Sequence, residues 1–470
     1  MDLNQSLYIE HLEELSMLYE QRVGLICINQ WKWPDFMPLE QRFEPHIDAL
    51  VIGEDEALAL CEEMAVSGEY SECYGALRVI CRQTNQKILA TCVAAMDLGK
   101  TENAMAARDA LCQDLPESFQ DEFVQFLLKK SPDHILLAAR IIASRRLDFA
   151  SELIEALQRY ADEKKMVLTL IHAIGRLRPR HGTEFLLNFL HSTDKEIVDT
   201  AVTALIRIGE RRALRECMAF IGPGDWPKMS LGLYGDQNTL SDSFFSVSDF
   251  DEEDTTALSR DHVIAIGLLG NIASIHELID CLENPDLAES AALALNLITG
   301  AQLTEEVFVP DDIDPDDLFD DERELWEKGL LYPKGKEPGV MINRLSRNSD
   351  DWIQWWKKKQ RRFNHRIRYR NGKPYSPACL LDNMTSKDSP EMIRKLAHEE
   401  LVIRYGIDIP FETHMTVHQQ LRAIETYMIR LKGNPDGFVD GLWYYNGKPI
   451  NEGLMVFEND VPSTFKEVAP

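Results

Sequence analysis

The sequence predicts an all-α protein whose middle is an α-solenoid, a stack of antiparallel helix pairs, with a helical N-terminal cap and a mixed C-terminal region that contains short β-hairpins. Two observations favour this fold. Amphipathic segments, most of which end in glycine, recur at variable spacings of about 30, 34, 61 and 30 residues, and two Asn-Gly turns lie near the end of the chain. At 470 residues the chain is long enough for an array whose core grows in one direction.

The clearest repeat lies at residues 195–209, KEIVDTAVTALIRIG, where apolar side chains share one helix face and Gly209 supplies a left-handed stop. The same apolar pattern occurs 34 residues earlier, with Gly175 aligned on Gly209. Residues 183–192 predict a second helix between the two. We therefore expect each unit to be a HEAT-like helix pair, and we assign residues 126–302 to such repeats.

Further copies of the pattern end at Gly270 and Gly300, and one upstream ends near Ser144 without a glycine. Residues 223–256 are rich in Pro, Gly, Ser and Asp and have no periodicity, so we expect an inserted loop there. Neighbouring pairs must stack to bury their apolar faces, and the stack presents an extended surface of the kind that holds proteins or peptides.

The regions on either side of the repeats differ in composition. Residues 1–125 carry helical stripes without a clean repeat, which favours an N-terminal helical cap. Residues 303–349 form an acidic linker or surface loop, with 12 acidic residues against one Arg between Glu305 and Glu327. The spacing of Asp312, Asp314 and Asp316 superficially resembles a calcium loop, but the required Gly and closing Glu are missing.

Residues 350–470 are expected to form a C-terminal helical region with two hairpins. Residues 369–376 and 444–451 share aromatic-x-Asn-Gly-Lys-Pro, and Asn-Gly favours a type I′ turn. The second hairpin is expected to continue into residues 453–460. Between the hairpins, residues 389–406 predict one more amphipathic helix with a glycine stop.

The densest basic and aromatic cluster of the chain lies at residues 350–373. Three interpretations are open: a structural role, including pairing with the acidic run; a protein-binding hot spot; or a site for single-stranded nucleic acid. The structural role is favoured, because three Trp residues at i, i+3 and i+4 share a helix face and at least two should be core. For a partner surface we expect exposed arginines, with one Trp and one Lys beside them: Arg361, Arg362, Arg366, Arg368, Trp352 and Lys358.

Composition restricts the function further. A formal charge of -28 makes nonspecific nucleic-acid binding unfavourable. The N-terminus lacks the pattern of a secretory signal, and no apolar run is long enough to span a membrane, so we expect a cytoplasmic protein. The nine cysteines include no C-x-x-C and are expected to be buried thiols.

No motif for catalysis or for a cofactor is present. His414 and His418 would share a face if both lay on a helix, but no third ligand has a clear spacing. We expect no catalytic residues, metal, cofactor or small-molecule substrate, and interpret the chain as a binding protein rather than an enzyme.

Two stretches resemble a known family. HLEELSMLYEQR (11–22) followed by LEQRFEPHIDAL, and WIQWWKKKQRRF with IRYRNGKPYS and LAHEELVIRYG, are similar to segments of a bacterial HEAT-repeat family of undetermined biochemical function, often encoded in type VI secretion gene clusters. The resemblance spans residues 11 to about 406 and implies a cytoplasmic accessory that binds an effector or a secretion component. The chain departs from it at 223–256 and 305–327.

The first hypothesis is therefore an adaptor or chaperone for a type VI secretion effector or its carrier. An immunity protein that blocks a cognate toxin is the first alternative, because an acidic solenoid could mimic nucleic acid toward a basic nuclease. The second alternative is an enzyme resembling the HEAT-repeat lyases that attach bilins.

Overall fold

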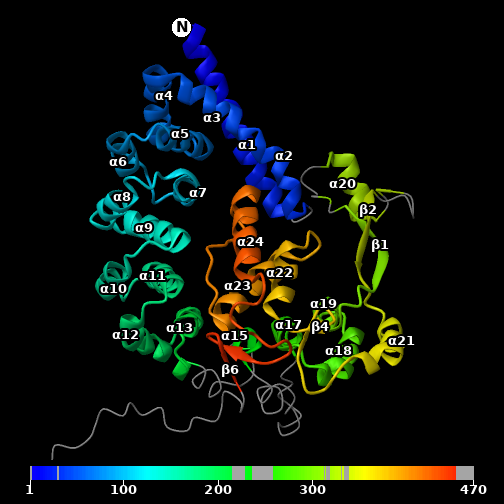
Figure 1. Ribbon diagram of the computed structural model, residues 1–470. Coiled ribbons are helices and arrows are strands. Elements are labelled where there is room, and N and C mark those ends of the chain that lie inside the picture. Colours follow the sequence, from blue (N-terminus) through cyan, green and yellow to red (C-terminus); the bar gives the residue numbers. More distant parts are fainter. Residues whose placement is uncertain are drawn as a thin grey trace, which may run out of the picture. The chain divides into compact units, whose positions relative to one another are not determined.

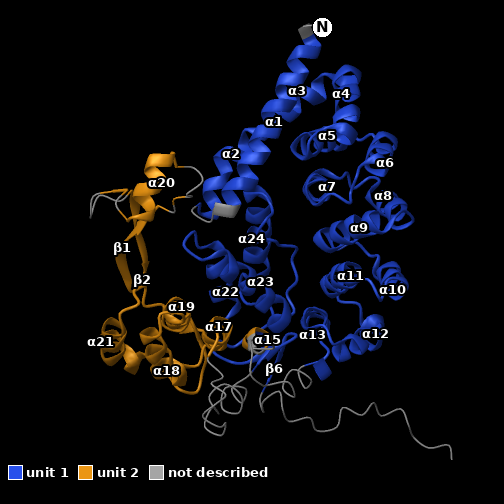
Figure 2. Ribbon diagram, turned by 180° about the vertical axis from the view of Figure 1, so that it is seen from behind, with its two compact units in different colours: residues 1–222, 233–239, 376–470 blue, residues 223–232, 240–375 orange. Residues whose placement is uncertain are grey.

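A computed structural model describes residues 3–28, 31–213, 228–235, 258–311, 313, 318–329, 331–332 and 338–450. It is mostly helical, with a few two-stranded sheets, and divides into two compact units (Figure 2). Unit 1 comprises residues 1–222, 233–239 and 376–470, and unit 2 comprises residues 223–232 and 240–375. Asp312, Asp314 and Asp316, whose spacing superficially resembles a calcium loop, and the expected extension at 453–460 lie outside the described residues.

The helices of unit 1 form two rows before residue 214, with α4, α6, α8, α10 and α12 along one row and α5, α7, α9, α11 and α13 along the other (Figure 1). We call the second row the inner row. The elements of this part are α1 (Leu3–Ile28), α2 (Met37–Gln41), α3 (Phe43–Ile52), α4 (Glu54–Ser67), α5 (Tyr70–Arg82), α6 (Gln86–Ala95), α7 (Thr101–Asp114), α8 (Gln120–Leu128), α9 (Pro132–Arg145), α10 (Ala150–Arg159), α11 (Lys164–Leu177), α12 (Thr183–Leu187) and α13 (Lys195–Ile208), with 3-10 helices at Trp33–Phe36, Arg180–Gly182 and Asn188–His191.

The C-terminal part of unit 1 lies against the inner row and comprises α22 (Pro377–Thr385), α23 (Glu391–Tyr405), α24 (Val417–Leu431), β5 (Tyr444–Tyr445) and β6 (Lys448–Pro449). A short helix, α15 (Lys228–Tyr234), contributes residues to both units and falls within the predicted inserted loop. Unit 2 contains α17 (Arg260–Leu269), α18 (Ile275–Asp280), α19 (Ala288–Thr299), β1 (Thr304–Pro310), α20 (Asp320–Glu327), β2 (Gly339–Leu345), α21 (Ser349–Lys359), β3 (Tyr369–Arg370) and β4 (Lys373–Pro374), with 3-10 helices at Ile272–Ser274, Cys281–Glu283 and Gln360–Arg362.

Left-handed residues end three consecutive helices of the inner row, α9, α11 and α13, at regular intervals. Arg146, Arg178 and Gly209 have φ of +56°, +57° and +103°, so the stops follow one another at 32 and 31 residues. In unit 2 the stops at Gly270 and Gly300 are 30 residues apart. The predicted ends at Gly209, Gly270 and Gly300 are confirmed, and the helix that was expected to end near Ser144 ends at Arg145, with Arg146 as its left-handed stop.

The prediction that Gly175 stops its helix is wrong. α11 continues past Gly175 to Leu177, and a Cβ on Gly175 would lie 2.7 Å from the Cβ of Ala204 on α13. Gly267 on α17 meets Ala294 on α19 at the same close range. These glycines let successive helices approach each other closely, because a Cβ at either position would collide with the neighbouring helix.

Each Asn-Gly hairpin closes a helix end. The N–H groups of Asn446 and Gly447 donate to the carbonyl oxygens of Ile403 and Arg404 in the last turn of α23, at 2.8 and 2.9 Å. A helix end leaves its last carbonyls without partners inside the helix, so these two bonds complete the cap.

The hairpin of unit 2 does the same for α19, where Asn371 and Gly372 donate to Leu297 and Ile298. All four turn residues have positive φ, as a type I′ turn requires, so both predicted hairpins are confirmed.

Cys61, Cys73, Cys81, Cys92, Cys112, Cys281 and Cys379 are free thiols, six of them buried and Cys112 partly so, as expected. Burial raises the pKa of the Cys61 thiol to about 12 and that of the Cys92 thiol to about 11. Among the described residues, none of the helices is both long and apolar enough to span a bilayer.

Candidate functional site

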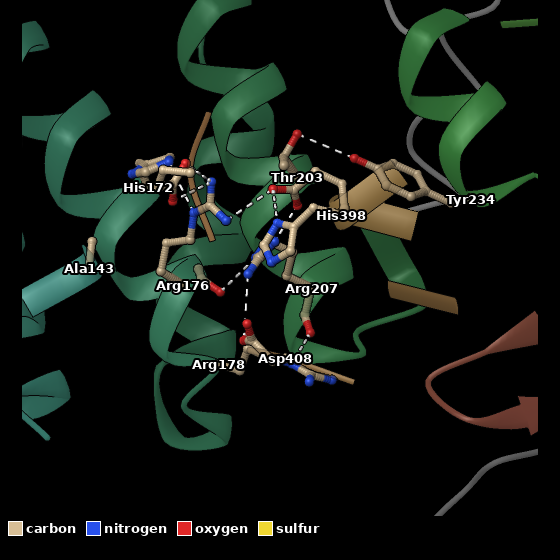
Figure 3. A network of polar contacts seen from close by, with 12 residues as sticks. Ala143, His172, Arg176, Arg178, Thr203, Arg207, Tyr234, His398 and Asp408 are labelled. Atoms are coloured by element: carbon tan, nitrogen blue, oxygen red, sulfur yellow. Dashed lines mark hydrogen bonds and ion pairs between the residues drawn. The ribbon is translucent and has the colours of Figure 1, made fainter. Parts of the chain in front are cut away.

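The inner row of unit 1 carries arginines at the ends of its helices, and these bind carboxylates of the C-terminal part (Figure 3). Glu399 of α23 lies between Arg176 of α11 and Arg207 of α13, with Arg176 Nη1 3.1 Å from Glu399 Oε1 and Arg207 paired to the other oxygen. Burial by itself would raise the pKa of Glu399, but Arg207 and Arg176 hold it well below its ordinary value. Glu399, Arg176 and Arg207 thus form a buried cluster in which all three side chains are charged.

Two further carboxylates extend this cluster. Glu412 Oε1 lies 3.0 Å from Arg176 Nη2. Asp408 Oδ1 lies 3.2 Å from Arg146 Nη2, and its other oxygen is 3.6 Å from Arg207. The pKa of Asp408 is lowered because Arg146 and Arg207 outweigh the effect of burial.

Other contacts attach the C-terminal part to the first helices of unit 1. Arg22 of α1 donates to the carbonyl of His414 and pairs with Glu40 at 2.7 Å, and Glu40 in turn accepts from the Val417 N–H. The guanidinium of Arg394 lies 4.2 Å from the ring centre of Trp33. Residues 376–450 therefore act as a strut that contacts the rest of unit 1 from its N-terminal helices to α13, and the charged ends of these inner helices are paired within unit 1.

The basic and aromatic segment of unit 2 is divided between core and surface. Trp352 and Trp356 of α21 are buried, which confirms that at least two of the three tryptophans are core. Trp352 Nε1 donates to the Ser346 carbonyl at 2.8 Å. Arg368 is 1% exposed; it donates to the Leu268 carbonyl at the end of α17, and its guanidinium lies 3.4 Å from the ring centre of Tyr375.

Arg361, Arg362, Arg366 and Lys358 are exposed, as a partner surface requires. The expectation that Arg368 is exposed is wrong, and Trp352 also has no accessible surface to offer a partner. The local reason is that its guanidinium stacks on Tyr375 and donates to the carbonyl oxygens of Leu268 and Leu269. Partner binding by the four exposed residues stays a prediction.

A larger accessible surface lies between α19 and α21, where an acidic linker was expected. Residues 304–345 form what we call the arm, in which β1 pairs with β2 over seven residues in antiparallel register. One face of this ribbon carries Val307 and Val309 opposite Ile342 and Val340. The expected linker is therefore an ordered ribbon in its described part.

The ribbon leaves its apolar side chains accessible on both faces. Val340 is 53% exposed on one face and Met341 is 61% exposed on the other, beside Phe308. An isolated pair of strands is only marginally stable in water, and it normally needs a further layer or strand. Contiguous exposed apolar groups of this kind mark binding surfaces.

The helix of the arm is accessible in the same way. None of the residues of α20 is buried. Phe319, at its N-cap, is 76% exposed, and Leu325 and Trp326 are also exposed. Acidic residues occupy its first turn, where the helix dipole favours negative charge. The arm thus combines an apolar ribbon with an amphipathic helix whose apolar side chains are accessible.

Two other features have less to offer a ligand. A polar cavity lined by Asp109, Cys112, Ser144 and His414, among others, has a volume of about 10 Å³, which is room for one water molecule. His414 precedes α24, whereas His418 lies within it, so the two do not share a helix face. In the part of the chain that the structure describes, no three metal-binding side chains gather.

A scan against protein-family models finds no matching family, and a search of the curated proteins finds no relative of this chain.

Sequence reasoning missed the arm because its acidic composition resembles that of a linker. A signal was nevertheless present: VFVP (307–310) and GVMI (339–342) are short apolar runs with β-branched residues, bounded by Pro and Gly, which is typical of strands. The ion cluster of unit 1 has no comparable signal, since Arg176 and Glu399 are far apart in the sequence.

Proposed function

We propose that this chain is a non-catalytic adaptor or chaperone, an α-solenoid of HEAT-like helix pairs that binds another protein through the arm. The observation that carries this proposal is the accessible apolar surface of β1, β2 and α20, with Val340, Met341 and Phe319 more than half exposed. Binding another protein would bury these side chains and supply the layer that the ribbon lacks.

The strut also supports binding through the arm, because it leaves less of the inner row free for a partner. In unit 1 the C-terminal part of the chain already occupies charged groups along the inner row, so the surface that a helical stack usually offers to a partner is partly taken. The resemblance at residues 11–406 suggests the partner: a type VI secretion effector or its carrier, bound in the cytoplasm before export.

The test is co-expression of the tagged chain with each protein encoded in the same secretion gene cluster, followed by purification. We expect one of them to co-purify at a fixed stoichiometry. Substituting Val309→Ser, Val340→Ser and Met341→Ser together should abolish that complex without lowering the melting temperature. A matched control, Met428→Ser with Ile429→Ser, removes exposed apolar groups of α24 and should leave the complex intact. Retention of the complex by the arm variant would contradict the proposal.

An immunity protein is the second candidate, and the acidic side chains on the arm favour it when the partner is a basic toxin. Glu306, Asp311 and Asp321 are exposed, and such charges speed association with a positively charged surface. Growth separates the two candidates: an immunity protein restores growth of cells that express the toxin, whereas an adaptor binds it without neutralising it.

A further inference from the structure

We infer that the arm takes up an extended, basic segment of its partner as a third strand along the outer edge of β2. This inference rests on the proposed function and adds to it the binding mode and the chemistry of the partner.

The register decides which main-chain groups face outward. Hydrogen bonds from Ser346 N–H to the Leu303 carbonyl and from Asp311 N–H to the Pro338 carbonyl, 2.9 and 2.8 Å long, close the two ends of the ladder. In an antiparallel pair, hydrogen-bonded residues alternate with residues whose N–H and C=O groups turn away from the neighbouring strand. The outward-facing positions of β2 are therefore Gly339, Met341, Asn343 and Leu345, and those of β1 are Thr304, Glu306, Phe308 and Pro310.

The two edges differ in what they can offer a third strand. Pro310 has no N–H, so the edge of β1 lacks a donor at one of its outward positions. β2 contains neither proline nor lysine, its one charged side chain, Arg344, is paired with Glu305 of β1, and its register is continuous, without a bulge. Natural proteins block sheet edges with such devices, and an edge without them is a template for another strand. Within the described residues, β1 is the one strand that pairs with β2, and α19 also contacts β2.

The ribbon also specifies the chemistry of the added strand. Both of its faces carry apolar side chains, next to polar ones such as Glu306 and Arg344, so the added strand gains from apolar, β-branched side chains beside Ile342 and Met341. The arm holds thirteen acidic and five basic residues, which favours a strand that carries Lys or Arg. A second copy of this chain fits poorly, because both copies would bring the same negative arm and a formal charge of -28.

Proline substitutions at outward positions test the edge. Pro removes an N–H that the ladder of the ribbon does not use, so the ribbon should persist. The probe is a labelled peptide of alternating Lys and Val, with the Glu and Val peptide as its matched control. We expect Met341→Pro and, separately, Asn343→Pro to weaken binding of the Lys peptide to the full chain about tenfold. Glu306→Pro, on the edge of β1, should change it less than about twofold. The Glu peptide should not bind.

Hydrogen exchange locates the contact and checks the fold. Binding of the Lys peptide should protect the amides of Met341 and Asn343, while the ladder amides of Val340 and Ile342 should stay protected in every proline variant. Equal binding by Met341→Pro, Asn343→Pro and the unchanged chain would overturn the inference, as would a concentration-dependent dimer that Met341→Pro abolishes.

The co-purifying partner separates this inference from the proposed function. If the serine variant of the arm loses that partner while both proline variants of β2 keep it, the arm binds through side chains and strand addition is wrong, although the proposed function stands. If the serine variant keeps the partner, the proposed function is wrong as well.

Discussion

At the scale of single residues, arginine holds unit 1 together. Arg176 and Arg207 lie at corresponding places near the ends of consecutive inner helices, and both are buried. Desolvating such charges is costly, and it is offset here by Glu399, Asp408 and Glu412. The cluster therefore fixes which surface of α23 faces the inner row, since a shift of the helix would separate the charges.

Replacing the central carboxylate should have a large effect. Glu399→Gln keeps the shape but leaves Arg176 and Arg207 buried without their shared anion, so we expect a loss of about 3–5 kcal/mol in the free energy of unfolding. Urea unfolding followed by circular dichroism measures this. Asp436→Asn, which breaks the surface pair with Arg430, is the control and should cost less than about 1 kcal/mol. Similar losses for the two variants would show that the cluster is not a special source of stability.

The same carboxylates should make unit 1 sensitive to acid. The folded state lowers the pKa of Glu399, Asp408 and Glu412, so their stabilisation is complete above their unfolded values, about 3.9 for Asp and 4.3 for Glu. It is lost as the pH falls through the lower folded values. We expect the free energy of unfolding to decline below about pH 4 and Glu399→Gln to show a shallower decline. An equal slope in the variant would exclude Glu399 as a contributor.

The arginines of the basic segment should separate into two classes. Charge reversal of exposed Arg361 and Arg366 should leave the melting temperature unchanged, because solvent surrounds both side chains. Arg368→Glu places a carboxylate against the Leu268 carbonyl and should unfold unit 2. Circular dichroism on heating compares the variants, and unfolding by the exposed pair of substitutions would contradict this division.

At the scale of elements, the chain reuses one device, an Asn-Gly hairpin that closes a glycine-terminated helix. The sequence predicted both the hairpins and the helices that end at Gly300 and Gly406, because each depends on a local backbone requirement for positive φ. It could not predict the stop at Arg178, since a non-glycine residue in the left-handed region gives no signal. Gly175 misled the prediction because glycine for close packing and glycine for a stop are indistinguishable in one sequence.

The hairpin turn itself can be tested with two glycines that differ in contact. Gly372→Ala places a Cβ 2.4 Å from the Thr299 carbonyl oxygen, at a φ of +73°. Gly433→Ala has a similar φ of +77° with no atom in reach, so it should cost about 1–2 kcal/mol from backbone strain alone. We expect Gly372→Ala to be clearly more destabilising in chemical unfolding. Equal losses of stability in the two variants would mean that the hairpin can shift to accommodate the added Cβ at no further cost.

At the scale of the whole molecule, each unit has its own organisation, and in unit 1 the first and last parts of the sequence stabilise each other. Long-range contacts such as Arg22 with His414 and Arg394 with Trp33 join them. Amphipathic periodicity locates helices but not their distant neighbours, so neither the strut nor its occupation of the inner row could be deduced from the sequence. The exposure of the arm could not be deduced for the same reason, because the sequence does not show which segments pack against it.

Loss of one strut contact should therefore destabilise parts of unit 1 that are distant from it in the sequence. Arg394 is buried, donates to Gln420 at 2.6 Å and stacks on Trp33. Because a hydrogen bond to a charged group contributes about 1.5–3 kcal/mol, Arg394→Ala should speed amide exchange roughly ten- to hundredfold. The effect should reach residues 33–41 as well as α24, but not α17 or α19. Exposed Arg422→Ala is the control, and an effect confined to α24 would contradict the strut.

The base of the arm has a consequence for how this protein could change. The chain enters the arm at Leu303 and leaves it at Ser346, and a single hydrogen bond joins these two residues. A replacement of everything between them could keep these two attachment points, with α19 and Arg347 as the neighbours that contact the arm. The arm can thus be exchanged as one segment of about forty residues, by evolution or by protein engineering. Such an exchange would alter which partner is bound and would keep the helices on either side.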